Sequence, residues 1–148
     1  MSDSTTIETT WTPPDRAVMR GVIPYLSMDG RAGEAADFYA KAFAASHLGR
    51  MSGENPAELM HCQVEINGGS LMMTDMRGPG EPVLKPQGFH LQLVVADGDL
   101  WWNRAVEAGC KVVMPFEKMF WGDRWGLLED PFGITWSVNE AAEYAGKE

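Results

Sequence analysis

Hydrophobic and polar residues follow two periods along this chain, and the same succession of periods occurs twice. Apolar residues recur at helical spacing from Ala32 to Ala45, and they alternate with polar residues, as in a strand, from Leu59 to Ile66. Each half is therefore predicted to contain one strand, one helix and three further strands. The predicted strands are Val22–Met28, Leu48–Met51, Leu59–Ile66, Ser70–Met76, His90–Val95, Lys111–Phe116, Arg124–Glu129 and Ile134–Asn139, and the predicted helices are Ala32–Ala45 and Leu100–Ala108.

Turn signals separate these elements at equivalent places in the two halves. Asn67-Gly68-Gly69 predicts a tight hairpin, Asp130-Pro131-Phe132-Gly133 predicts a second one, and Gly109 is expected to end the second helix. Gly69 and Gly133 lie 133 − 69 = 64 residues apart, close to the spacing of the two first strands. The repeat predicts an α+β fold of two βαβββ modules, whose curved mixed sheets surround a cup and carry the helices on the outer face.

The domain boundaries follow from this repeat and from a Gly- and Pro-rich stretch, Arg77–Gln87, between the halves. The expected segments are a polar N-terminal tail (1–19), a first module (20–78), a linker (79–87), a second module (88–140) and a C-terminal tail (141–148).

Composition narrows the classes of partner. The chain has 148 residues and a formal net charge of −9, from 21 acidic and 12 basic residues, so a nucleic acid is not an expected partner. A small molecule that is apolar or cationic is favoured. No apolar run is long enough for a membrane helix and the N-terminus lacks a signal peptide, which predicts a cytoplasmic protein. Cys62 and Cys110 do not form a Cys-x-x-Cys motif and are expected to be buried, reduced thiols.

Six segments of the sequence, in their order along the chain, resemble the vicinal oxygen chelate superfamily (glyoxalase/bleomycin resistance/dioxygenase). The likeness is to its PhnB-like branch in particular, also labelled demethylubiquinone methyltransferase-like. The resemblance covers about Val22 to Glu140. It does not support a methyltransferase, because no Gly-rich nucleotide loop follows a strand. The segments that carry the resemblance are PYLSMDG (24–30), DFYAKAF (37–43), MHCQVEINGGSLMMTD (60–75), FHLQLVVAD (89–97), MFWGDRWG (119–126) and DPFGITWSVNE (130–140).

The resemblance also implies where a metal would bind, on the first strand of each module and on the last strand. His90 matches the position in the second module, whereas the first-module position falls on Pro24 or Val22, depending on the anchor used for counting. The family's glutamate position falls on Ser137, and Leu71–Thr74 offers no carboxylate either. A divalent ion needs several converging N or O donors, so we expect no metal and no other cofactor.

Strand alternation indicates which side chains line the cup. If Met60 and the even-numbered residues of its strand pack under the helix, the odd-numbered residues face the cup. Trp121 and Trp125 bracket a loop that would offer aromatic surface and a cation, although such a loop can also serve packing alone. The histidines, in turn, can be ordinary strand residues. The candidate ligand-binding residues are His61, Gln63, Glu65, His90, Gln92, Trp121, Arg124, Trp125 and Ser137.

These observations favour a small-molecule-binding protein with a degenerate, metal-free site and an unknown substrate, which the resemblance suggests forms a homodimer. Three alternatives stay open. The first is an enzyme of the lyase, isomerase or dioxygenase type, which uses acid/base histidines or a metal relocated to His61, Glu65 and His90. The second is a drug-sequestering resistance protein. The third is a module for protein interaction. The sequence does not assign catalytic residues.

Overall fold

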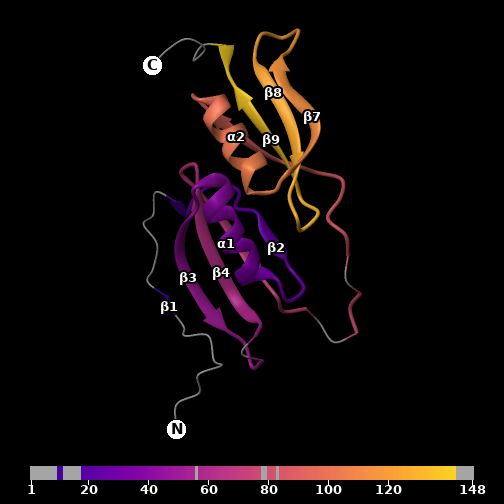
Figure 1. The fold of residues 1–148 in the computed structure, drawn as a ribbon. Coiled ribbons are helices and arrows are strands. Elements are labelled where there is room, and N and C mark those ends of the chain that lie inside the picture. Colours follow the sequence, from indigo (N-terminus) through magenta and orange to yellow (C-terminus); the bar gives the residue numbers. More distant parts are fainter. Residues whose placement is uncertain (1–9, 12–17, 56, 78–79, 83, 143–148) are drawn as a thin grey trace. The chain divides into compact units, whose positions relative to one another are not determined.

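The computed structural model describes residues 10–11, 18–55, 57–77, 80–82 and 84–142, drawn in colour in Figure 1. The chain divides into two compact units between Val83 and Leu84, except that Lys41–Phe43 group with the second unit. Each unit contains a sheet with a βαβββ arrangement. The prediction of an α+β fold with two βαβββ modules is therefore confirmed.

The sheet of the first unit has the strand order β1-β3-β4-β5-β2, with β2 parallel to β5 and antiparallel pairing elsewhere. The helix of this module, α1, follows β2 and lies over one face of the sheet (Figure 1). The elements are β1 (Thr10–Trp11), β2 (Tyr25–Ser27), α1 (Ala32–Phe43), β3 (Ser46–Ser52), β4 (Leu59–Ile66) and β5 (Gly69–Thr74).

The sheet of the second unit has the order β6-β9-β8-β7, with β6 parallel to β9. This order matches the first sheet once β1 is set aside, so the two modules share one topology. The elements are β6 (Leu91–Val95), α2 (Gly98–Ala108), β7 (Lys111–Lys118), β8 (Arg124–Glu129) and β9 (Thr135–Glu140).

Local sequence explains where these elements turn and end. Asn67 and Gly68 both have positive φ, 52° and 83°, which is the requirement of the two-residue turn that joins β4 to β5. Asp97 caps α2 by accepting a hydrogen bond from the backbone N–H of Leu100, and Gly109 ends it at φ 126°. The predicted hairpin and the predicted helix stop are both confirmed.

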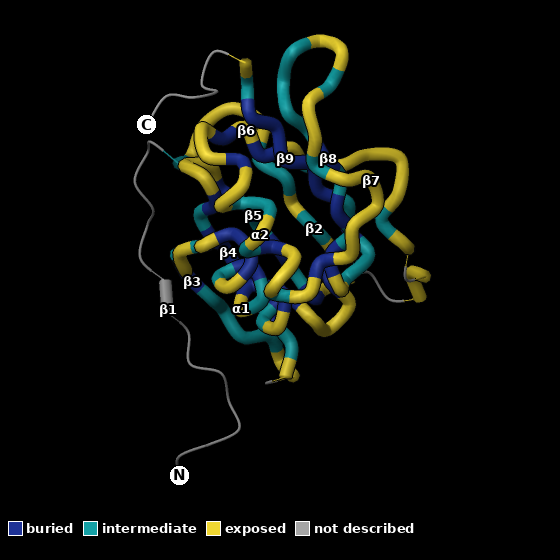
Figure 2. Tube along the Cα trace, turned by 45° about the horizontal axis from the view of Figure 1, so that its top comes forward, coloured by how far each residue is buried: buried dark blue, intermediate teal, exposed yellow. Residues whose placement is uncertain are grey.

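Each helix buries its apolar stripe against its own sheet, and Figure 2 shows the buried stretches in dark blue. In the first unit, Ala35 and Tyr39 of α1 and Cys62 and Val64 of β4 are fully buried. In the second unit, a Cβ on Gly126 would lie only 2.6 Å from the ring of Trp102, so the absence of a side chain in β8 lets α2 pack closely.

A buried carboxylate at the end of the last strand holds the start of the helix in both modules. In the first, Asp75 accepts hydrogen bonds from the backbone N–H groups of Ala32 and Leu59 at 2.9 and 2.8 Å. In the second, Glu140 accepts one from the backbone N–H of Gly98 at 2.8 Å. A carboxylate at the N-terminal end of a helix satisfies free N–H groups and complements the helix dipole.

The structure also corrects the sequence prediction at two places. The pairing of β3 with β4 is irregular, because Met51 lies opposite His61 whereas the next residue, Ser52, lies opposite Leu59. Met60 is therefore an extra residue in β4, and Leu59 instead of Met60 is buried near α1, while Met60 is 49% exposed. One extra residue in a strand reverses the faces beyond it. In addition, Thr10–Trp11, placed in a polar tail by the sequence, pairs with the edge of the first sheet as β1.

Candidate functional site

Gln92 of β6 is the centre of a hydrogen-bonded group on the helix-free face of the second sheet. Its Oε1 atom accepts hydrogen bonds from Trp125 Nε1 at 3.1 Å and from Ser137 Oγ at 3.0 Å. Two donors on one atom identify it as the oxygen and fix the plane of the amide. The amide nitrogen of Gln92 has no hydrogen-bond partner among the described residues and projects as a ready donor.

Aromatic rings surround this amide. The ring of His90 lies 6.2 Å from that of Trp125 in an edge-to-face arrangement, and the ring of Trp121 lies 6.4 Å from that of Trp125. Phe120, which is 98% exposed, packs edge-on against Trp121 at 4.9 Å. The structure thus brings five of the nine predicted residues into one cluster, which we call the Gln92 cluster: His90, Gln92, Trp121, Trp125 and Ser137.

In the first unit, the helix-free face carries a second polar pair. The hydroxyl of Tyr25 and Nδ1 of His61 are 2.8 Å apart, and their rings meet edge-on at 5.7 Å. Which of the two atoms donates the proton depends on the tautomer of His61. Sequence reasoning selected His61 and missed Tyr25.

The internal repeat contains the signal that finds Tyr25. Tyr25 pairs with Met72, three residues before the capping carboxylate Asp75, and Gln92 pairs with Ser137, three residues before the corresponding Glu140. Tyr25 and Gln92 are therefore equivalent positions in the two modules.

The same strand registers make His61 equivalent to Trp125. Gln63, two residues after His61, pairs with Met72, and Leu127, two residues after Trp125, pairs with Ser137. Both modules consequently place a hydrogen bond between the same two positions of the repeat.

Gln63 and Glu65 lie beyond His61 on β4, and the structure treats them differently. Gln63 is fully buried, because Val18 and Met19 of the preceding segment lie against it and against Ser70. Glu65 is half-buried beside Ser70, with which it pairs in register. Met19 and Ser70 are contacts that sequence reasoning missed, since the expected N-terminal tail gave no periodic signal.

Arg124 is not part of the Gln92 cluster. It hydrogen bonds to Asp99 of α2 at 2.8 Å, lies 3.5 Å from Glu140, and its guanidinium stacks over the ring of Phe116 at 4.4 Å. The Asp99 carboxylate raises the pKa of Arg124, and Arg124 in turn lowers the pKa of Asp99. Neighbouring strand residues face opposite sides, so Arg124 belongs to the helix side and Trp125 to the open side.

The register also locates the first-module position that corresponds to His90. His90 precedes Gln92 by two residues, so its equivalent precedes Tyr25 by two and is Ile23. Sequence counting gave Pro24 or Val22, because the connection from β2 to α1 is one residue longer than that from β6 to α2 (25 to 32 against 92 to 98). The correction leaves the chemistry unchanged, since isoleucine cannot bind a metal.

The donors near the Gln92 cluster do not suit a divalent ion. The strand beside His90 presents hydroxyl and amide side chains on the open face, namely Thr135, Ser137 and Asn139, and no carboxylate. In the part of the chain that the structure describes, no group of three or more His, Cys, Asp or Glu side chains is arranged so that it could hold a metal ion. A single imidazole beside neutral oxygens is a weak donor set for zinc, nickel or manganese.

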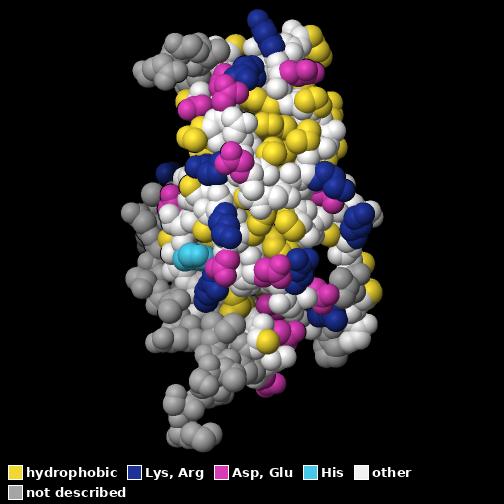
Figure 3. Space-filling model, viewed as in Figure 1, with side chains coloured by type: hydrophobic (Ala, Val, Ile, Leu, Met, Phe, Trp, Pro, Cys, Tyr) yellow, Lys and Arg dark blue, Asp and Glu magenta, His cyan; other side chains and the backbone are white. Residues whose placement is uncertain are grey.

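Charge and thiol chemistry add two further constraints. On the face shown in Figure 3, basic and acidic side chains are interspersed and no basic patch forms. Cys62 and Cys110 are buried free thiols, as expected, and burial raises the pKa of Cys62 to about 11 and that of Cys110 to about 12. Thiols of this kind are poor nucleophiles at neutral pH.

Neither described helix has the length and apolar character needed to span a bilayer.

One prediction stays a prediction, because it concerns residues of both units. It says that a single concavity is shared by His61, Gln63, His90, Gln92 and Ser137.

Comparisons with known proteins point to one family. The family model of the Glyoxalase/Bleomycin resistance protein/Dioxygenase superfamily matches residues 23–138. The uncharacterized protein Rv0887c of Mycobacterium tuberculosis (strain ATCC 25618 / H37Rv) is 38% identical over 124 residues, which cover 79% of this chain and 72% of the relative. Protein YjdN of Escherichia coli (strain K12) is 28% identical over 138 residues, covering 78% of this chain and 92% of YjdN.

Solved structures agree with this match. Protein PA1353 from Pseudomonas aeruginosa has a TM-score of 0.66 at 26% identity and covers 80% of this chain and 95% of its own. The PhnB protein from Bacillus cereus has a TM-score of 0.65 at 18% identity, with coverages of 80% and 98%. At 18% identity the second likeness concerns the fold alone.

Proposed function

Because the chain belongs to the glyoxalase/bleomycin resistance protein/dioxygenase superfamily, we propose that it binds a small apolar or cationic molecule at the Gln92 cluster, without a metal ion. The observation that carries this proposal is the fixed amide of Gln92, whose oxygen is held by Trp125 and Ser137 while its nitrogen is left as a donor. A pre-oriented polar group among aromatic rings is the usual composition of a small-molecule site.

The cluster also indicates what kind of molecule fits. The rings of Trp121 and Trp125 offer flat apolar surface, which binds planar groups and also attracts cations. Gln92 Nε2 would donate to a carbonyl or ether oxygen of the ligand. His90 lies at the edge of the same surface and adds a second polar contact. A planar compound with one hydrogen-bond acceptor matches all of these groups.

The metal-free part of the proposal rests on donor chemistry. On the open face, the neighbouring strand β9 offers His90 no carboxylate, and the equivalent of His90 in the first module is Ile23. Glu140, the carboxylate at the end of β9, hydrogen bonds to the backbone N–H of Gly98 at the start of α2. A site relocated to His61 and Glu65 is disfavoured, because the two residues are four positions apart along the strand, a separation of about 13 Å, and their side chains stand perpendicular to the sheet. Two donors on one ion lie within about 4.4 Å of each other.

A binding experiment tests the proposal directly. A thermal-shift screen of neutral and cationic planar compounds, with divalent metals as a separate arm, would supply a binder. That binder should shift the NMR resonance of the Trp125 indole N–H, which is hydrogen bonded to Gln92. Gln92→Ala should weaken binding by about tenfold, the equivalent of one hydrogen bond with its positioning effect.

Gln87→Ala is the matched control, because Gln87 is also exposed but lies outside the cluster. It should leave the affinity unchanged. Affinity that is insensitive to Gln92→Ala, or that appears only when a divalent metal is added, would contradict the proposal. Turnover of the bound compound would support the enzymatic alternative at the same site, whereas unchanged compound would support sequestration.

A further inference from the structure

The amide of Gln63 is an unusual feature of the first unit. Gln63 is fully buried on the helix-free face of the sheet, yet its Oε1 atom has no hydrogen-bond partner among the described residues. Nearly all buried polar atoms in proteins are hydrogen bonded, so an unpartnered carbonyl oxygen calls for an explanation. A ligand that brings a donor to this oxygen provides one.

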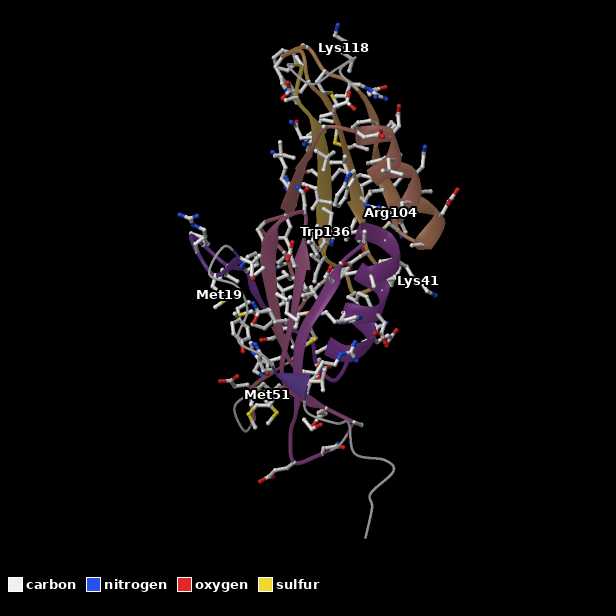
Figure 4. All side chains as sticks on the ribbon, turned by 90° about the vertical axis from the view of Figure 1, so that its left-hand side faces the viewer. Met19, Lys41, Met51, Arg104, Lys118 and Trp136 are labelled. Atoms are coloured by element: carbon white, nitrogen blue, oxygen red, sulfur yellow. The ribbon has the colours of Figure 1, made fainter. Side chains whose placement is uncertain are left out.

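The group that covers Gln63 is held weakly. Gln63 Nε2 donates to Ser70 Oγ at 3.0 Å and to the sulfur of Met19 at 3.2 Å, and Ser70 Oγ donates to the carbonyl oxygen of Val18 at 2.6 Å. A thioether is a weak acceptor, and methionine changes its rotamer readily. Met19 lies on the side of the first sheet opposite α1 (Figure 4) and is 40% exposed. Its side chain can therefore leave Gln63 at small cost.

A second acceptor lies close by on the same face. Glu65 follows Gln63 by two strand residues, a separation of about 7 Å, and the residue is half-buried. No hydrogen bond or ion pair engages this carboxylate within the described ranges. Gln63 Oε1 and the Glu65 carboxylate can only accept hydrogen bonds, so their natural partner is a group that only donates and carries positive charge.

We propose that Gln63 and Glu65 form a binding site for a small organic cation with N–H donors, of the amidinium or guanidinium type, which enters by displacing the side chain of Met19. The cation donates one hydrogen bond to Gln63 Oε1 and one or more to Glu65. The site lies wholly in the first unit and does not depend on the function proposed for the Gln92 cluster.

Two probes of equal charge and similar size test the proposal on the intact protein. Benzamidine carries a planar cation with N–H donors, whereas benzyltrimethylammonium carries a cation with none. Benzamidine should shift the side-chain amide resonances of Gln63 in a saturable manner. Benzyltrimethylammonium should bind at least about tenfold more weakly, because it cannot replace the missing donor. Equal affinity for the two cations, or no shift of the Gln63 amide with benzamidine, would overturn the proposal.

Variants separate this site from general attraction to an acidic protein. Glu65→Gln should weaken benzamidine binding about tenfold, while Glu117→Gln, an exposed carboxylate of the second unit, should not change it. Met19→Ala removes the cover and should tighten binding severalfold. Gln63→Met, checked for folding by circular dichroism, should abolish the effect of Met19→Ala. An unchanged affinity in Glu65→Gln would refute the assignment even if Gln63→Met does not fold.

Discussion

Asp130 offers a quantitative test of how the second sheet is built. It follows β8 and is 3% exposed. Its Oδ1 atom accepts hydrogen bonds from the backbone N–H groups of Phe132 and Ile134 at 2.9 and 3.0 Å, and its Oδ2 atom accepts one from Trp136 Nε1 at 2.9 Å. Through these bonds one carboxylate fixes the turn and the start of β9, the strand that carries Ser137 into the Gln92 cluster.

The substitution Asp130→Asn keeps the shape and changes the hydrogen bonding. In the better orientation, the new Oδ1 retains both backbone N–H groups, while the new NH2 group faces the indole N–H of Trp136, which is another donor. The loss of a hydrogen bond to a charged acceptor costs about 1.5–3 kcal/mol, and a buried unpaired donor adds about 1–3 kcal/mol when no relaxation occurs. Allowing for overlap of these costs, we expect a loss of about 2–4 kcal/mol. For a chain of this length that is roughly 5–15 °C in Tm.

Urea unfolding followed by far-UV circular dichroism would measure the free energy of unfolding. Asp29→Asn is the control, because Asp29 is exposed, pairs with Arg77 at the surface and has φ 51°, which asparagine tolerates well. It should change stability by less than about 0.5 kcal/mol. Trp136→Phe removes the opposed donor, so the double variant with Asp130→Asn should be more stable than the two single effects predict. A loss below about 0.5 kcal/mol in Asp130→Asn, or simple additivity, would refute this reasoning.

Four further predictions concern packing, thiols, metal and assembly. Gly126→Ala should destabilise the protein by more than about 2 kcal/mol, because the new methyl group would lie 2.6 Å from an indole ring and 2.7 Å from a backbone carbon. Gly33→Ala, with ordinary contacts at 3.5 Å in a helix, should stabilise it by about 0.5–1 kcal/mol. Thermal unfolding of both variants would check this. Folding raises the pKa of Cys62 and Cys110 from 9.0 to about 11 and 12, so the stability that the neutral thiols contribute is full below pH 9 and should decline above it. Replacing both cysteines by alanine should flatten the dependence of the urea midpoint on pH between about 9 and 11. An unchanged slope would contradict the burial argument. Protein purified without chelator or affinity tag should contain no stoichiometric metal by elemental analysis, and about one nickel, zinc, manganese or iron per chain that disappears in His90→Ala would overturn the metal-free proposal. We also expect a homodimer by light scattering at micromolar concentration, and a monomer there would count against it.

Local sequence determined most of the secondary structure, since each signal acts over a few residues. The alternation of Leu59–Ile66 and the positive-φ turn at Asn67-Gly68 set a hairpin, and Gly109 ended a helix, because backbone sterics and side-chain period need no distant partner. The order of these elements, repeated once, was enough to predict the fold, whereas the family followed from the resemblance of whole segments such as DPFGITWSVNE (130–140). The same alternation, applied to Arg124 and Trp125, already requires that they face opposite sides of β8.

Tertiary structure decided which side chains meet. No local pattern could show that Gln92 accepts from Trp125 and Ser137, since three strands contribute to that contact, or that Met19 covers Gln63 from a segment 44 residues away. The face occupied by Met60 depended on a register shift between β3 and β4, which is a property of the pair of strands. Periodicity tells a residue which side of its own strand it occupies, whereas its partners depend on strand order, register and coverage, all of which arise from contacts distant in sequence.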